Sequence, residues 1–140
     1  MKTKLDKSIF KFVEHELYNY QDTKEDLKDL EKSIAEEAMG NIEYDNFSST
    51  ESYPGGSTTE SAAIDIIQNK VAKRMADTIK NIEKALGKLD EEKLELFFKK
   101  YKQTKPWQTI IVEMNISQAT YFRWRKKIVI QVAKEMGLTQ

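Results

Sequence analysis

The chain has 140 residues, of which 39% are hydrophobic and 33% charged, and its two prolines and five glycines favour helices over a β-sandwich or barrel. No cysteine and a single histidine exclude disulfide bonds, thiolate metal sites and catalytic centres built from two histidines, so we expect no cofactor. The formal net charge is zero, yet the stretch from Lys99 to Gln140 holds nine Lys and Arg against two Asp and Glu. A basic end of this kind suits a surface that binds phosphate groups. The expected fold class is all-α.

Residues 1–39 are predicted to form an N-terminal helical arm. No apolar run here or later is long enough for a signal peptide or a membrane-spanning helix, so we expect a cytoplasmic protein with no membrane partner. Apolar residues recur at steps of three and four, which is typical of an amphipathic helix: Leu5, Ile9, Phe12, Val13, Leu17, Tyr20, Leu27, Leu30 and Ile34. Asp22-Thr23 resembles a second helix start, so one bent helix and two helices in line stay equally open.

Residues 40–61 are predicted to be a flexible linker. The composition changes there to Asn, Ser, Thr, Asp and Glu around Tyr53-Pro54-Gly55-Gly56. A segment of this composition can bury too little apolar surface to become ordered alone. Several apolar side chains interrupt this composition, and a partly docked loop is the alternative.

Residues 62–87 are predicted to form a long helix with an apolar seam. Its members follow spacings of three and four close to a heptad repeat: Ile64, Ile67, Val71, Met75, Ile79, Ile82 and Leu86. Such a seam needs a partner, because a helix of this kind is not stable alone in water. The partner is either the N-terminal arm, in an antiparallel hairpin, or a second chain, in a coiled-coil homodimer, and the sequence leaves both open.

Residues 88–140 are predicted to form a separate domain with its own three-helix core. Gly87 suits the end of the preceding helix, and Asp90 suits the N-cap of a helix that ends before Pro106. The apolar residues expected to face the core on that helix are Leu94, Phe97, Phe98 and Tyr101.

The rest of this domain has the pattern of a helix-turn-helix. Pro106-Trp107 suits the first turn of a short helix, and Asn115 tolerates the left-handed conformation of a tight corner. Ile116 can fill the angle between two helices, and Ser117 is a natural N-cap for a final helix that runs to Gly137. A short helix, a turn and a helix that opens with small polar residues is typical of DNA-binding proteins.

The final helix divides into two faces at 100° per residue. Tyr121, Trp124, Ile128 and Val132 fall on the face expected to pack inward. The residues expected to contact base edges are Gln118, Ala119, Phe122 and Arg123, although Phe122 fits a core position equally well. The residues expected to contact DNA phosphates are Lys105, Gln108, Ser117, Thr120, Arg125, Lys126 and Lys127.

The chain resembles the RinA family of phage transcriptional regulators along most of its length. The resemblance is carried by Leu17-Tyr18-Asn19-Tyr20, Asp22-Thr23-Lys24, the run from Leu27 to Ile34, a Gly/Ser/Thr-rich middle, Ala85-Leu86, Ile116-Ser117 with Thr120 and Arg123, and Lys134-Glu135-Met136-Gly137. It implies an activator of phage or prophage late genes that acts with bacterial RNA polymerase, through a C-terminal part similar to region 4 of sigma factors. Sigma factors tend to have a charged residue where this chain has Ala119, so the resemblance does not transfer a base preference.

Two other functions fit the sequence less well than a regulator that binds double-stranded DNA. A small terminase-type subunit also joins a helix-turn-helix to helices that oligomerise, and a helical adaptor could bind an acidic protein through its basic end. An enzyme is not expected, because no carboxylate has a catalytic partner at motif spacing and no glycine loop could hold phosphates.

Overall fold

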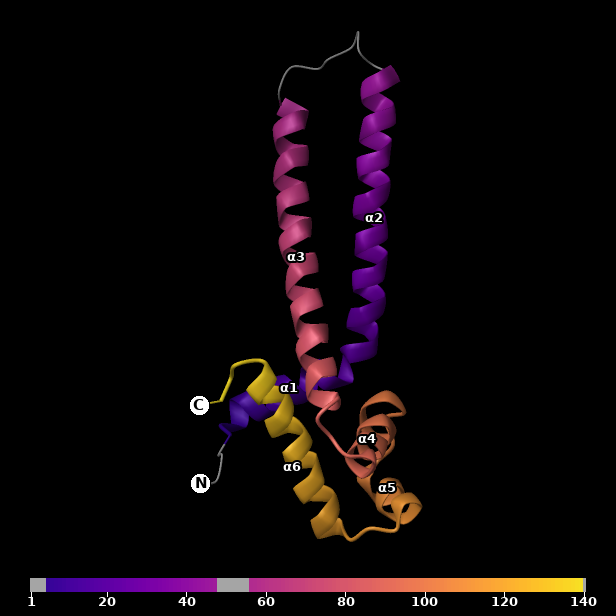
Figure 1. Ribbon diagram of the computed structural model, residues 1–140, viewed down its shortest axis with the longest axis vertical. Helices are drawn as coiled ribbons and strands as arrows, with labels where there is room; N and C mark the ends of the chain where they lie inside the picture. The colour runs from indigo at the N-terminus through magenta and orange to yellow at the C-terminus, as the bar shows by residue number, and fades with distance from the viewer. Residues whose placement is uncertain (1–4, 48–55, 140) are drawn as a thin grey trace. The chain divides into compact units, whose positions relative to one another are not determined.

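The computed structural model describes the backbone of residues 5–47 and 56–139, and the side chains of residues 5–37 and 63–139. All regular structure in these ranges is helical, which confirms the predicted all-α class (Figure 1). The α-helices are α1 (Lys7–Tyr18), α2 (Tyr20–Phe47), α3 (Gly56–Leu86), α4 (Glu91–Phe97), α5 (Trp107–Met114) and α6 (Gln118–Glu135), and a π-helical turn, η1 (Phe98–Lys102), follows α4. No helix in the described ranges is both long and apolar enough to span a lipid bilayer.

The predicted N-terminal arm consists of two helices that separate at Asn19. Asp6 caps the first of them, accepting a hydrogen bond from the backbone N–H of Ser8 at 3.3 Å. Asn19 leaves the helical path with φ −91° and ψ 0°, and its side-chain amide lies 3.0 Å from Nε2 of His15. Short polar side chains favour such local hydrogen bonds over helix continuation, which explains a break three residues before Asp22.

Both long helices extend into the range predicted to be a linker. Helix α2 continues to Phe47 and α3 begins at Gly56, so the prediction of irregular structure over residues 40–61 was too wide at both ends. Helix propagation adds one hydrogen bond for each residue fixed, and a long helix therefore extends into residues of modest helix propensity. Residues 48–55, the remainder of the predicted linker, lie outside the described residues.

The chain divides into two compact units that do not follow the predicted boundary at Lys88. An arm unit runs from Asp22 to Asp77, and a head unit combines Met1–Gln21 with Thr78–Gln140. The reason lies in the core of the head unit, where Val13 and Leu17 of α1 and Ile82 of α3 are as fully buried as residues of α4 to α6. Residues 88–140 therefore do not enclose a complete core.

Helices α2 and α3 run in opposite directions in the arm unit (Figure 1). The apolar seam predicted on α3 is open to solvent in its first half, where Ile64, Ile67 and Val71 have exposed fractions between 42% and 61%. On α2, Leu27, Leu30 and Ile34 are half-buried. A closed hairpin would bury this part of the seam between α2 and α3, whereas the described side chains leave much of it exposed.

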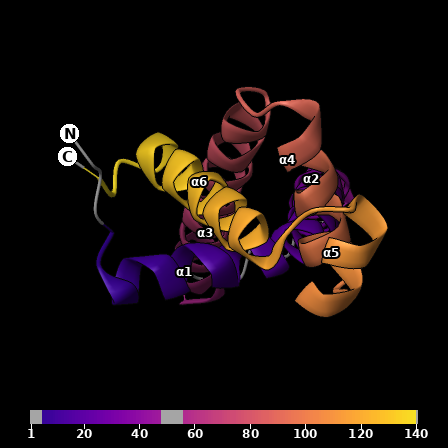
Figure 2. The same cartoon turned by 90° about the horizontal axis from the view of Figure 1, so that it is seen from below.

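The core of the head unit is formed where α6 packs against α1 and α4 (Figure 2). Its fully buried side chains come from α1, α3, α4, α5 and α6, and are Val13, Leu17, Ile82, Ala85, Leu96, Ile110, Tyr121, Ile128, Val129, Val132 and Ala133. Phe97 of α4 and Tyr101 of η1 are nearly buried. Helix α6 thus packs against α1, α4 and α5, and other residues along it stay exposed.

Candidate nucleic-acid interface

The turn between α5 and α6 has the local geometry that the sequence predicted. Asn115 adopts the left-handed conformation, with φ 53° and ψ 49°, directly after α5. The backbone N–H of Ile116 then donates to the carbonyl oxygen of Ile111 at 3.1 Å, and the half-buried Ile116 side chain packs on the core. Oγ of Ser117 accepts the backbone N–H of Thr120 at 3.0 Å and so caps α6. The predicted corner and the predicted cap are both confirmed.

The inward face of α6 is wider than the predicted stripe. Tyr121, Ile128 and Val132 are fully buried as predicted, whereas Trp124 is half-buried with the ammonium group of Lys93 5.6 Å from the centre of its ring. Val129 and Ala133 are also fully buried, although the sequence prediction did not include them. Both belong to the core of the head unit, in which α6 packs against α1 as well as α4 and α5.

The predicted base-contacting residues lie together on the first two turns of α6. Gln118, Ala119 and Arg123 are exposed. Phe122 is partly packed and partly accessible: its ring centroid lies 5.8 Å from that of Trp107, while 38% of the residue stays exposed. These four residues thus form one accessible surface, which we call the reading face.

Four of the predicted phosphate-contacting residues flank the reading face and are exposed: Gln108, Ser117, Lys126 and Lys127. Thr120 is half-buried, and its hydroxyl oxygen accepts a hydrogen bond from the hydroxyl of Ser117 at 2.9 Å. The ammonium group of Lys105 lies 2.8 and 2.9 Å from the carboxylate oxygens of Glu113, which also binds Lys99. The charge of Lys105 is therefore compensated within the chain.

Arg125 was predicted to contact a DNA phosphate, but in the structure it binds a carboxylate of the same chain. Its Nε and Nη2 atoms donate to the two carboxylate oxygens of Glu14 on α1, at 2.9 and 2.6 Å. Its guanidinium group also lies 4.9 Å from the ring centre of Phe10. This bidentate pair joins α1 to α6 and uses the guanidinium group of Arg125. Arg125 is therefore not among the proposed DNA contacts.

Glu14 connects three elements of the head unit. Besides Arg125 it accepts a hydrogen bond from the hydroxyl of Tyr101 at 2.7 Å, and the ammonium group of Lys100 lies 3.9 Å away. Burial by itself raises the pKa of Glu14, but the hydrogen bonds from Arg125 and Tyr101 outweigh this effect and hold the pKa below its ordinary value. Burial and the adjacent carboxylate raise the pKa of the Tyr101 hydroxyl, so Tyr101 stays a donor.

This joint should make the stability of the protein depend on acid pH. Because the folded-state pKa of Glu14 is lowered, its contribution is complete above the ordinary carboxyl value near 4.5 and is lost as the pH falls through the folded-state value. We expect Glu14→Gln to lower the free energy of unfolding by about 1–3 kcal/mol at pH 7 and by less at pH 3. Urea denaturation at several pH values measures this difference. An equal loss at both pH values would contradict the assigned role.

The described fold and site define an all-α protein with a helix-turn-helix in its head unit. Among the described side chains no three His, Asp or Glu are grouped closely enough to hold a metal ion. The model of the family described as "Protein of unknown function (DUF722)" matches residues 1–134, and the chain belongs to this family. No curated protein and no solved structure matches the chain.

Proposed function

We propose that this chain is a sequence-specific regulator of transcription that binds double-stranded DNA with α6 in the major groove. The observation that carries the proposal is the reading face. Gln118, Ala119, Phe122 and Arg123 are accessible at the start of a capped helix whose opposite face is buried. A major groove is about 12 Å wide and admits one helix, whose first turns reach the base edges.

The side chains of the reading face suit the recognition of base pairs. An exposed Gln118 amide can form two hydrogen bonds with adenine, and the guanidinium of Arg123 can form two with guanine. Ala119 and the exposed part of Phe122 can contact a thymine methyl group. These chemistries together would provide sequence preference at several neighbouring base pairs.

Three exposed lysines of α6 support binding to a polyanion. Lys126, Lys127 and Lys134 belong to none of the ion pairs among the described residues. Exposed cations on α6 that form no ion pair among the described residues would neutralise backbone phosphates and release counterions from DNA. Lys126, Lys127, Gln108 and Ser117 are therefore the phosphate contacts in this proposal.

The resemblance to the RinA family extends the proposal to the biological role. By that resemblance the protein would activate late genes of a phage or prophage, together with RNA polymerase, in the cytoplasm of a bacterial host. The exposed isoleucines of the α3 seam favour pairing of two chains, which would present two copies of α6 to one DNA site. A footprint on DNA upstream of the neighbouring genes would identify the promoter.

The proposal predicts different effects for two cations on α6. With a duplex selected from a randomised pool, we expect Arg123→Ala to weaken specific binding by about 1–3 kcal/mol and to relax the preference at one base position. Lys126→Ala should weaken binding to selected and scrambled duplexes alike. Fluorescence anisotropy titrations of both variants on both duplexes measure the two effects.

Arg74→Ala is the matched control, because Arg74 is an exposed arginine of α3 in the arm unit. It removes the same charge and should leave sequence preference unchanged. Unaltered affinity and preference of Arg123→Ala would show that the reading face is assigned wrongly. The absence of any preferred duplex for the wild-type protein would refute the proposed function itself.

A further inference from the structure

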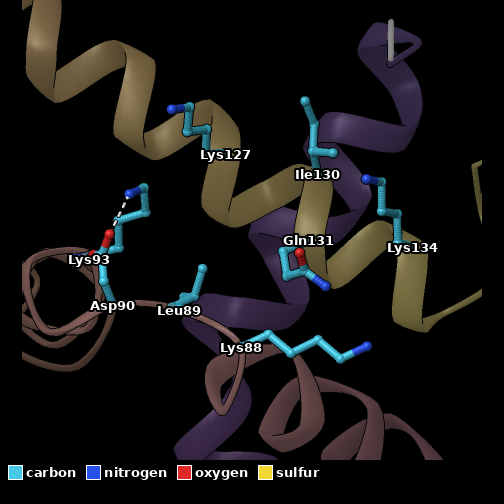
Figure 3. Close-up of a pocket in the computed structure, with 8 residues that line it drawn as sticks. All are labelled: Lys88, Leu89, Asp90, Lys93, Lys127, Ile130, Gln131 and Lys134. Atoms are coloured by element: carbon cyan, nitrogen blue, oxygen red, sulfur yellow. Dashed lines mark hydrogen bonds and ion pairs between the residues drawn. The ribbon is translucent and has the colours of Figure 1, made fainter. Parts of the chain in front are cut away.

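A hollow surrounded by lysines lies on the head unit, beside the later turns of α6 (Figure 3). Its volume is about 270 Å³, and it is lined by Lys88, Leu89, Asp90, Lys93, Lys127, Ile130, Gln131 and Lys134. The residues come from the connection between α3 and α4, from α4 itself and from α6. The hollow is thus built from segments about 40 residues apart in the sequence, and we call it the lysine hollow.

The lysine hollow has an excess of positive charge. Lys93 is paired with Asp90, at 2.8 Å between the ammonium nitrogen and the carboxylate oxygen. Lys88 is paired with Glu135, whose carboxylate lies 3.7 Å from the ammonium group of Lys84 as well. The two carboxylates thus lie among five lysines, Lys84, Lys88, Lys93, Lys127 and Lys134. The charge of Lys127 helps to lower the pKa of Asp90, whereas Lys134 belongs to none of the ion pairs between the described residues. An anion would compensate this excess.

The position of the hollow along α6 connects it with the bound duplex. Arg123 and the hollow residues Lys127 and Lys134 lie on one face, because at 100° per residue they fall within 40° of one another. Helix α6 has 18 residues and is about 27 Å long, more than twice the width of the major groove. A helix that reads bases with its first turns is therefore long enough to reach a backbone strand with its later ones.

We propose that the lysine hollow binds a backbone phosphate of the duplex that α6 reads. Lys134 supplies a charge that no ion pair among the described residues compensates, and Lys88 can exchange Glu135 for the phosphate because Lys84 remains near that carboxylate. This inference rests on the proposed function. It adds three lysines to the DNA-binding surface: Lys88 and Lys93, which lie outside the helix-turn-helix, and Lys134, which lies near the end of α6. A contact of this kind fixes the position of α6 along the groove without reading sequence.

The salt dependence of DNA binding tests the lysine hollow. We expect the double variant Lys134→Gln and Lys88→Gln to reduce the slope of log K against log salt concentration by about 0.9, the value for one phosphate, and each single variant to reduce it by less. The preference for the selected over the scrambled duplex should stay as in the wild-type protein. Lys32→Gln, an exposed lysine of α2 in the arm unit, is the control and should leave the slope unchanged. Thermal melting of each variant checks that the fold is retained.

Each outcome separates this inference from the proposed function. An unchanged slope in the double variant, with Arg123→Ala still losing specificity, would overturn the lysine hollow and leave the function in place. An unchanged slope together with amide NMR shifts of residues 88–93 and 127–134 on adding inorganic phosphate would assign the hollow to free phosphate instead, and would overturn the backbone contact. A wild-type protein that binds no duplex would refute the function and, with it, this site.

Discussion

A fragment from Lys88 to Gln140 is expected to be unfolded in dilute buffer, although it contains the whole helix-turn-helix. The fragment lacks α1 and the end of α3, which contribute Val13, Leu17, Ile82 and Ala85 to the buried core. Truncating one large buried aliphatic side chain costs about 2–5 kcal/mol, and a whole domain is stable by only about 5–15 kcal/mol. Loss of these residues together should exceed the stability that remains. Circular dichroism and thermal melting measure the result.

The matched control keeps the head unit and removes only the arm unit. Residues 5–21 joined to residues 78–139 by a flexible Gly/Ser linker retain every buried residue of the head core. We expect this protein to melt cooperatively and to bind duplex DNA. Cooperative melting of the Lys88–Gln140 fragment would instead show that the head core forms without α1.

Tyr121→Ala should be among the most destabilising single substitutions in the head unit, with a loss of about 3–5 kcal/mol in the free energy of unfolding. Tyr121 is the largest of the fully buried side chains, and its ring meets that of Phe122 edge to face at 5.0 Å between centroids. Its removal leaves a cavity directly behind the reading face. Urea denaturation followed by circular dichroism measures the loss.

Two comparisons make this prediction specific. Trp124→Ala should cost less than Tyr121→Ala, because Trp124 is half-buried. Val112→Ala on α5 should change stability by less than about 0.5 kcal/mol, since 77% of Val112 is exposed. A larger loss for Trp124→Ala than for Tyr121→Ala would contradict the assignment of the core behind α6.

Local features of the fold could be predicted from the sequence because their causes are local. Asp90 accepts the backbone N–H of Lys93 at 2.9 Å, and Ser117 and Asn115 form the predicted cap and corner. Gly137, expected at the end of the last helix, has φ +75° directly after Met136, the C-cap of α6. Each of these features depends on a side chain and backbone atoms within a few residues of it.

Features that depend on distant partners could not be predicted in the same way. Glu14 and Arg125 are 111 residues apart, and each has the appearance of an ordinary charge on an amphipathic helix. Helix α4 gives way to the π-helical turn at Phe98, and the structure buries Leu96, Phe97 and Tyr101 while it exposes Leu94 and Phe98. A prediction that assumed an uninterrupted α-helix therefore assigned two of the four inward residues wrongly.

The packing of α1 on α6 has a consequence for the order in which the chain folds during synthesis. Helix α1 is synthesised before the other helices of the head unit, whereas α6, against which it packs, is synthesised after them. At about 5–20 residues per second, the 111 residues that separate Glu14 from Arg125 take about 6–22 s to synthesise. Throughout that interval the apolar side of α1 lacks its native cover on the ribosome, so it would be a natural substrate for a chaperone, and the head unit can form only after α6 has emerged.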